Sequence, residues 1–99
     1  MANTNSISLV ASSSQYLSIL DADQTGLDVI GDITIECWCK FTQLPSVSGT
    51  TMALVSKWDD VLVDERSFLV TVGTLDKAKF WYSSDGTNTP VTKVESTPA

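Results

Sequence analysis

The stretch GDITIECWCKF, residues 31–41, carries the clearest pattern in the sequence because apolar and polar residues alternate along it. A period of two is typical of a β-strand with one buried face, whereas an amphipathic helix repeats every 3.6 residues. The stretch therefore predicts a long strand whose buried face carries Ile33, Ile35, Cys37, Cys39 and Phe41.

Shorter apolar runs separated by turn residues extend this interpretation to most of the chain. Pro- or Gly-containing stretches such as LPSVSGT and SDGTNT punctuate the runs, and no stretch has the signature of a capped amphipathic helix. The 99 residues make one domain at most, which we expect to be an antiparallel all-β sandwich over residues 1–99. The further predicted strands are 6–11, 15–20, 51–58, 66–73, 77–84 and a weaker one over 90–96.

The two cysteines at positions 37 and 39 are the only ones in the chain. On a strand their Cα atoms would lie ~6.5–7 Å apart with parallel side chains, at the far edge of disulfide geometry. The chain has no histidine to complete a zinc site, and a redox pair requires the spacing C-x-x-C. We therefore predict that Cys37 and Cys39 are reduced and lie buried as small apolar residues.

The charge and hydropathy of the chain argue against binding to nucleic acid and against a membrane-spanning helix. Asp and Glu number 12 against 6 Lys and Arg, which gives a net charge of −6. Without a basic run, binding to nucleic acid is not expected. Neither a secretory signal nor an apolar run of the ~20 residues that a membrane helix needs is visible, so the cytoplasm is the default compartment.

Five stretches, taken in order, resemble the laminin-G-like, concanavalin A-like family of lectin and glucanase jelly rolls. They are YLSI at 16–19, GDITIECWCK at 31–40, VSKWD at 55–59, SFL at 67–69 and FWYSSDG at 80–86. The resemblance implies a jelly-roll sandwich and covers about residues 6–95. Members of the family continue with further strands, so the chain resembles the N-terminal half of such a domain.

Candidate ligand-binding residues lie around the tryptophans. Trp58 precedes two acids in KWDDVLVDER, and an indole ring that stacks on a sugar beside carboxylates would form a carbohydrate site. The alternative is a solvated hairpin loop. The stretch KFWYSSDG offers a second ring, which is equally compatible with a core or an interface. The candidate set is Trp58, Asp59, Asp60, Trp81 and Asp85.

The acidic stretch DADQTGLDVIGD, residues 21–32, partly matches the spacing of an EF-hand loop. Its flanks look like strands and its twelfth position lacks Glu, so we predict no cofactor or metal, with calcium as the alternative. Catalysis is not expected either, because the chain has no histidine and no strand carries the paired carboxylates of a glucanase.

Two functions remain open at this stage. The first is a non-catalytic structural or interaction protein that completes its β-sandwich by self-association, most simply as a homodimer. An apolar fraction of 42% favours it, because a short chain has little interior in which to bury that much apolar surface. The second is a carbohydrate-binding, lectin-like module.

Overall fold

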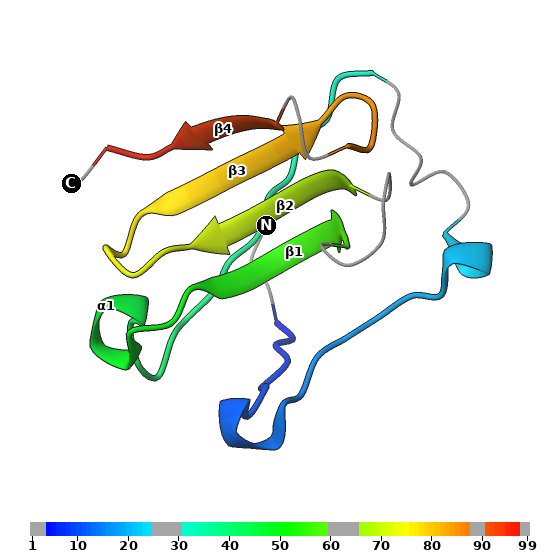
Figure 1. Cartoon of the computed structure of the whole chain (residues 1–99). Helices are drawn as coiled ribbons and strands as arrows, with labels where there is room; N and C mark the ends of the chain where they lie inside the picture. Colours follow the sequence, from blue (N-terminus) through cyan, green and yellow to red (C-terminus); the bar gives the residue numbers. More distant parts are fainter. Residues whose placement is uncertain (1–3, 25–30, 60–65, 88–90, 98–99) are drawn as a thin grey trace. The chain divides into compact units, whose positions relative to one another are not determined.

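The computed structural model describes residues 4–24, 31–59, 66–87 and 91–97 (Figure 1). The chain divides into two compact units, Met1–Cys37 and Trp38–Ala99. All of the described strands belong to the second unit.

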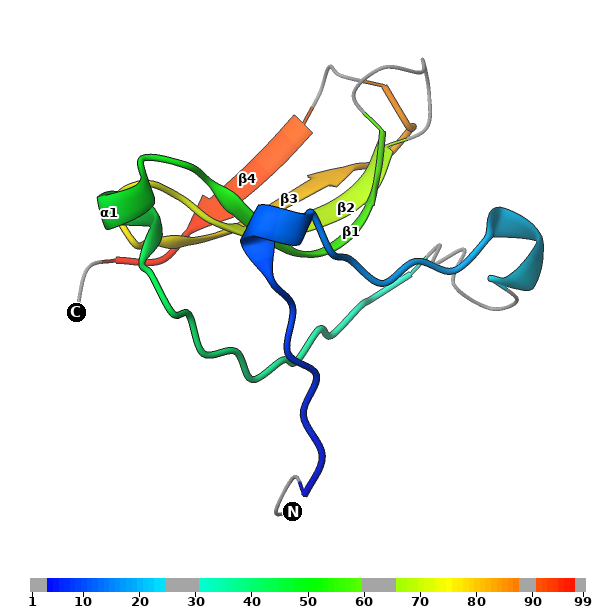
Figure 2. The same ribbon diagram turned by 90° about the horizontal axis from the view of Figure 1, so that it is seen from below.

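The second unit is built on one antiparallel sheet of four strands. Its strands occur in the sheet in chain order, so each pairs with the next along the chain, and they twist relative to one another (Figure 2). The sheet confirms the all-β, antiparallel prediction and the strands predicted near 51–58, 66–73, 77–84 and 90–96. The four strands are β1 (Met52–Trp58), β2 (Arg66–Val72), β3 (Ala78–Ser83) and β4 (Val91–Glu95).

The two faces of the sheet differ in chemistry. Residues paired across antiparallel strands point to the same face, so Val70, Phe80 and Val94 share one face. On that face the rings of Phe80 and Tyr82 stack with their centroids 6.2 Å apart. We call it the apolar face, although Lys57 and Thr92 also lie on it; its apolar residues are Met52, Val55, Phe68, Val70, Val72, Phe80, Tyr82 and Val94. The opposite, polar face carries Leu69, Thr71, Lys79, Trp81, Lys93 and Glu95.

Little of this apolar surface is buried. Among the described side chains only those of Pro45, Thr71 and Val72 are buried, and Val72 is 8% exposed. By contrast, Tyr82 and Val94 on the same apolar face are 42% and 61% exposed. On the apolar face Val72 is thus buried, four side chains are half-buried, and those of Val55, Tyr82 and Val94 are exposed.

A single helical turn, α1 (Pro45–Ser48), precedes β1. Pro45 occupies the first helical position, which suits its fixed φ, and Gly49 ends the turn with a φ of 70°. The carboxylate of Asp76 in the β2–β3 turn accepts hydrogen bonds from the backbone amide of Ser46 at 2.9 Å and from its hydroxyl at 2.5 Å. These two bonds attach α1 to the sheet.

The described part of the first unit contains no strand. Its regular elements are two short 3-10 helices, η1 (Ala11–Ser13) and η2 (Asp21–Asp23), so the strands predicted over 6–11 and 15–20 are wrong. The local bonds explain the first of these errors. The side chain of Gln15 accepts a hydrogen bond from the amide of Val10 at 2.9 Å, and Ser14 adopts a positive φ of 50°.

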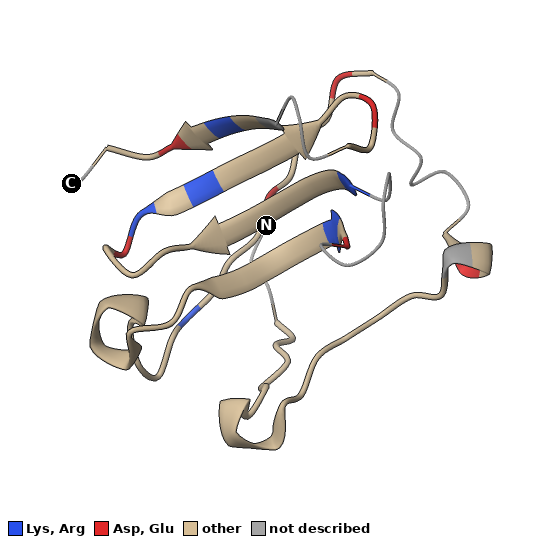
Figure 3. Ribbon diagram, viewed as in Figure 1, with Lys and Arg blue, Asp and Glu red and all other residues tan. Residues whose placement is uncertain are grey.

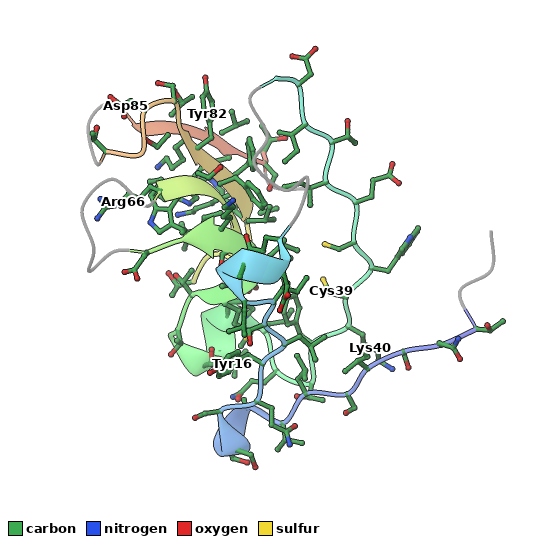
Figure 4. All side chains as sticks on the ribbon, turned by 90° about the vertical axis from the view of Figure 1, so that its right-hand side faces the viewer. Tyr16, Cys39, Lys40, Arg66, Tyr82 and Asp85 are labelled. Atoms are coloured by element: carbon green, nitrogen blue, oxygen red, sulfur yellow. The ribbon has the colours of Figure 1, made fainter. Side chains whose placement is uncertain are left out.

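The strand predicted over 31–41 is also wrong. The backbone of this stretch makes no hydrogen bond to any other described residue, and Trp38 is 97% exposed. Cys37 and Cys39 are free thiols, as predicted, but both are exposed, so their predicted burial is wrong. The physical reason is that alternation gives a strand a face to bury but supplies no partner for its backbone. In Figure 4 the stretch around Cys39 and Lys40 is a trace without a strand.

Candidate functional site

Trp58 and Asp59 lie where β1 ends. A shift in register between Lys57 and Trp58 places Trp58 opposite Arg66, the first residue of β2. The guanidinium carbon of Arg66 lies 5.9 Å from the centroid of the Trp58 ring, within the range of a cation–π contact. Trp58 is half-buried, and the cation rests against its ring.

Asp85 lies in the β3–β4 turn and organises that turn. Its Oδ1 accepts hydrogen bonds from the amide of Thr87 at 3.0 Å, from the hydroxyl of Thr87 at 2.8 Å and from the hydroxyl of Ser83 at 3.2 Å. These bonds, led by the one from the Thr87 amide, hold the pKa of Asp85 below its ordinary value of 3.8. The carboxylate therefore stays ionised at neutral pH and stabilises a turn of fixed shape.

The sheet brings these residues together at one end. The amide of Arg66 donates a hydrogen bond to the carbonyl of Gly86 at 3.1 Å, so the start of β2 is joined to the turn that holds Asp85. Arg66 and Asp85 both lie at the end that faces the viewer in Figure 4. Of the candidate set, Trp58, Asp59 and Asp85 thus share one end of the sheet, whereas Asp60 lies outside the described residues.

Trp81 does not join them. It lies inside β3, where it pairs with Leu69 and Lys93 on the polar face. The Nζ of Lys93 lies 5.3 Å from the centroid of the Trp81 ring. Each tryptophan thus contacts a different cation, Arg66 for Trp58 and Lys93 for Trp81.

A lysine cluster on the polar face was not predicted from the sequence. The carboxylate of Glu95 accepts from the Nζ atoms of Lys77 at 3.2 Å and Lys79 at 3.2 Å, and the Nζ of Lys93 lies at 3.9 Å. In Figure 3, blue segments lie on β3 and β4, and a red segment lies at the end of β4. Hydrogen bonds from Lys77 and then Lys79 hold the pKa of Glu95 below its ordinary value of 4.5. Three of the six cations of the chain thus surround one anion.

The signal for this cluster is the alternation of charge in KAKFWY and TKVES. It becomes readable only when the register is known, because Lys79 must lie opposite Glu95 and Trp81 opposite Lys93. Sequence reasoning had no means of aligning β3 with β4.

The described residues do not include a cluster of side chains with the geometry of a metal site. No group of three or more His, Cys, Asp or Glu side chains among them is placed to hold a metal ion. In the loop that partly matches an EF-hand, Asp21–Asp23 form η2, the side chain of Gln24 donates to the carbonyl of Ile19 at 3.0 Å, and residues 25–30 lie outside the described residues. No described helix is long and apolar enough to cross a membrane.

No family model, no curated protein and no solved structure matches this chain.

Proposed function

We propose that this chain is a non-catalytic β-sheet protein that completes its fold by associating with a second copy of itself. The observation that carries the proposal is the exposure of part of the apolar face, on which Val94 remains 61% exposed and Tyr82 42%. An uncovered apolar surface of this kind marks an interaction site, because soluble proteins rarely leave such a surface in water.

Exposed apolar side chains in the first unit also support self-association. Its described apolar side chains also face solvent: Leu17 is 69% exposed, Leu20 72% and Ile7 67%. A second sheet would pack ~10 Å from the first and form a sandwich, as the resemblance to jelly rolls implies. A two-fold dimer is the commonest closed assembly, and we expect it to bury more than the ~1,600 Å² of a standard interface.

The molecular mass of the protein in solution tests this proposal. Light scattering and sedimentation equilibrium over a range of micromolar concentrations are expected to give a dimer whose unfolding midpoint rises with protein concentration. A monomer at tens of micromolar, with a concentration-independent midpoint, would contradict it.

A carbohydrate-binding module is the second candidate, and one observation favours it. Trp58, Asp59 and Asp85 gather at one end of the sheet, where a sugar ring could stack on the indole beside carboxylates. A glycan array, read with and without calcium, is the test. Binding that is lost in Trp58→Ala but kept in Trp81→Ala would support this end of the sheet as the site.

A further inference from the structure

The outer edge of β4 is the better of the two open edges of the sheet for accepting another strand. β4 pairs with β3 from Val91 to Glu95 without a shift in register, whereas β1 carries two shifts along its pairing with β2. Bulges of that kind protect an edge from further pairing. In the described part of the chain no strand lies beyond β4, which forms the upper edge of the sheet in Figure 1.

The chain also contains a strand-like stretch that is not paired with any other described segment. Residues 31–41 alternate between apolar and polar side chains, yet their backbone makes no hydrogen bond to another described residue. Among its described residues, a single copy therefore has both an open edge and a strand-like stretch that is not paired. Each would satisfy the backbone groups of the other.

The two faces of the sheet fix how this stretch would lie. Its apolar residues Ile33 and Ile35 would extend the apolar face beside Val94. Its acidic residues Asp32 and Glu36 would then extend the polar face, which carries the lysine cluster. A shift of one residue in the register between residues 31–41 and β4 would place the apolar side chains on the polar face and the acidic ones on the apolar face. The side-chain pattern therefore specifies which face each residue of the stretch joins.

Charge favours the same arrangement. All six Lys and Arg residues lie in the second unit, whereas the first unit holds five of the twelve acidic residues and no cation. Asp32 and Glu36 are exposed and form no ion pair with a described residue. On β4, Lys93 has the most exposed side chain of the cluster, at 44%, and the longest separation from Glu95.

The register follows from opposing charges. With Ile35 opposite Val94 in an antiparallel pair, Glu36 lies opposite Lys93. Thr34 then lies opposite Glu95. A slip of two residues in either direction would place Asp32 or Glu36 opposite Glu95, and like charges directly opposite are destabilising.

We infer that residues 31–41 of a second copy of this chain pair antiparallel with the outer edge of β4, with Ile35 opposite Val94 and Glu36 opposite Lys93. The inference rests on the proposed self-association and names its contact. Two copies that exchange this strand reciprocally form a closed two-fold dimer in which both β4 edges are covered.

A disulfide trap tests the register. The pairing places Cys37 opposite position 92, where Cα atoms lie about 4.5–5.5 Å apart, within the range of a disulfide. In a chain carrying Cys39→Ser and Thr92→Cys, mild oxidation with oxidised glutathione is expected to give a covalent dimer. Peptide mapping should join Cys37 of one copy to position 92 of the other.

Two matched variants serve as controls. Val94→Cys, again with Cys39→Ser, places its thiol on the same face but opposite Ile35, so its cross-link to Cys37 should form at least several-fold more slowly. Thr92→Cys with both Cys37→Ser and Cys39→Ser measures any link between two introduced thiols. Light scattering of the reduced proteins reports whether each variant remains dimeric.

The outcomes of these experiments distinguish the proposed strand contact from the proposed self-association. A monomer that has lost two hydrogens would show that the stretch pairs within its own chain and would overturn the inference. A dimer that does not form the link from Cys37 to position 92, or that forms it no faster than the control at position 94, would overturn the inference while leaving self-association intact. A reduced protein that is monomeric at tens of micromolar would overturn both.

Discussion

The sheet of Trp38–Ala99 and the segment over residues 4–37 carry the same kind of sequence pattern and differ in structure. β2 and β3 are apolar-rich runs in which apolar and polar side chains partly alternate, and residues 6–11, 15–20 and 31–37 show the same kind of pattern, most regularly over 31–37. The first set forms a ladder of paired strands, whereas the described part of the second contains no strand. Alternation therefore indicates that a segment can use a strand face, and the availability of a neighbouring strand decides whether it does.

The spacing along the chain explains which segments find neighbours. β2 and β3 are joined by a five-residue turn between Val72 and Ala78, in which Asp76 has a positive φ of 56°. Such short connections close hairpins at a small cost in conformational entropy. The stretch 31–41, by contrast, is followed by α1 before β1 begins, so it has no hairpin partner beside it in sequence.

The largest expected effect lies in the sheet. Val72→Asp should destabilise the protein by about 3–5 kcal/mol, because it leaves an uncompensated charge at a position that is 8% exposed. Leu17→Asp, at a position that is 69% exposed, should change the free energy of unfolding of the monomer by less than about 0.5 kcal/mol. Urea titrations followed by tryptophan fluorescence at low protein concentration measure both. Equal losses in the two variants would remove the contrast between the regions.

The attachment of α1 to the β2–β3 turn is expected to matter next. Asp76→Ala removes the acceptor of both Ser46 hydrogen bonds, and a lost cap of this kind costs about 1–2 kcal/mol. Asp76→Asn keeps an acceptor and tolerates the positive φ, so its free energy of unfolding should fall by less. A larger loss in Asp76→Asn than in Asp76→Ala would contradict this role.

Removing the hydroxyl of Thr71 is expected to stabilise the protein. Its Oγ1 is buried on the polar face and has no hydrogen-bond partner in the described part of the chain. Thr71→Val replaces it by a methyl group of similar shape and should raise the free energy of unfolding by about 1 kcal/mol. Thr51→Val, at an exposed position, is the matched control and should change little.

Reversing the charge of Lys93 tests whether the sheet of one copy contacts residues 31–41 of another. Lys93→Glu should place like charges opposite each other at the proposed contact and weaken the dimer by about fivefold, the equivalent of about 1 kcal/mol. Adding Glu36→Lys to the same chain restores opposite charges and should recover the affinity. Sedimentation equilibrium gives the dissociation constants. If the double variant is as weak as the sum of its single changes, the two residues do not face each other.

The smallest effect concerns pH. Because the folded protein lowers the pKa of Glu95, its ionisation contributes stability that is present above the ordinary pKa of 4.5 and is lost as pH falls through the lower folded value. Urea midpoints between pH 6 and pH 3 should therefore fall less in Glu95→Gln than in the unmodified chain. An identical pH dependence of the two proteins would show that the lysine cluster does not act through this carboxylate. Added salt should reduce the difference, because the cluster is partly exposed.

The all-β class and the positions of β1 to β4 are predictable from the sequence, because each strand combines alternating or continuous apolar residues with a turn signal on its flank. It also indicated that Cys37 and Cys39 would be free, since strand-like spacing opposes a disulfide between them. These properties depend on neighbours in the chain, which a sequence shows directly.

Which segments pair, and which side chains meet, depends on the tertiary fold and is not readable from the sequence. Residues 31–41 have the pattern of a strand but no ladder, so the thiols that were expected to be buried are exposed. Trp58 meets Arg66, and Lys77, Lys79 and Lys93 converge on Glu95, because register sets both arrangements. Register is a relation between distant segments, and alternation within one strand does not state which residue of another strand will lie opposite.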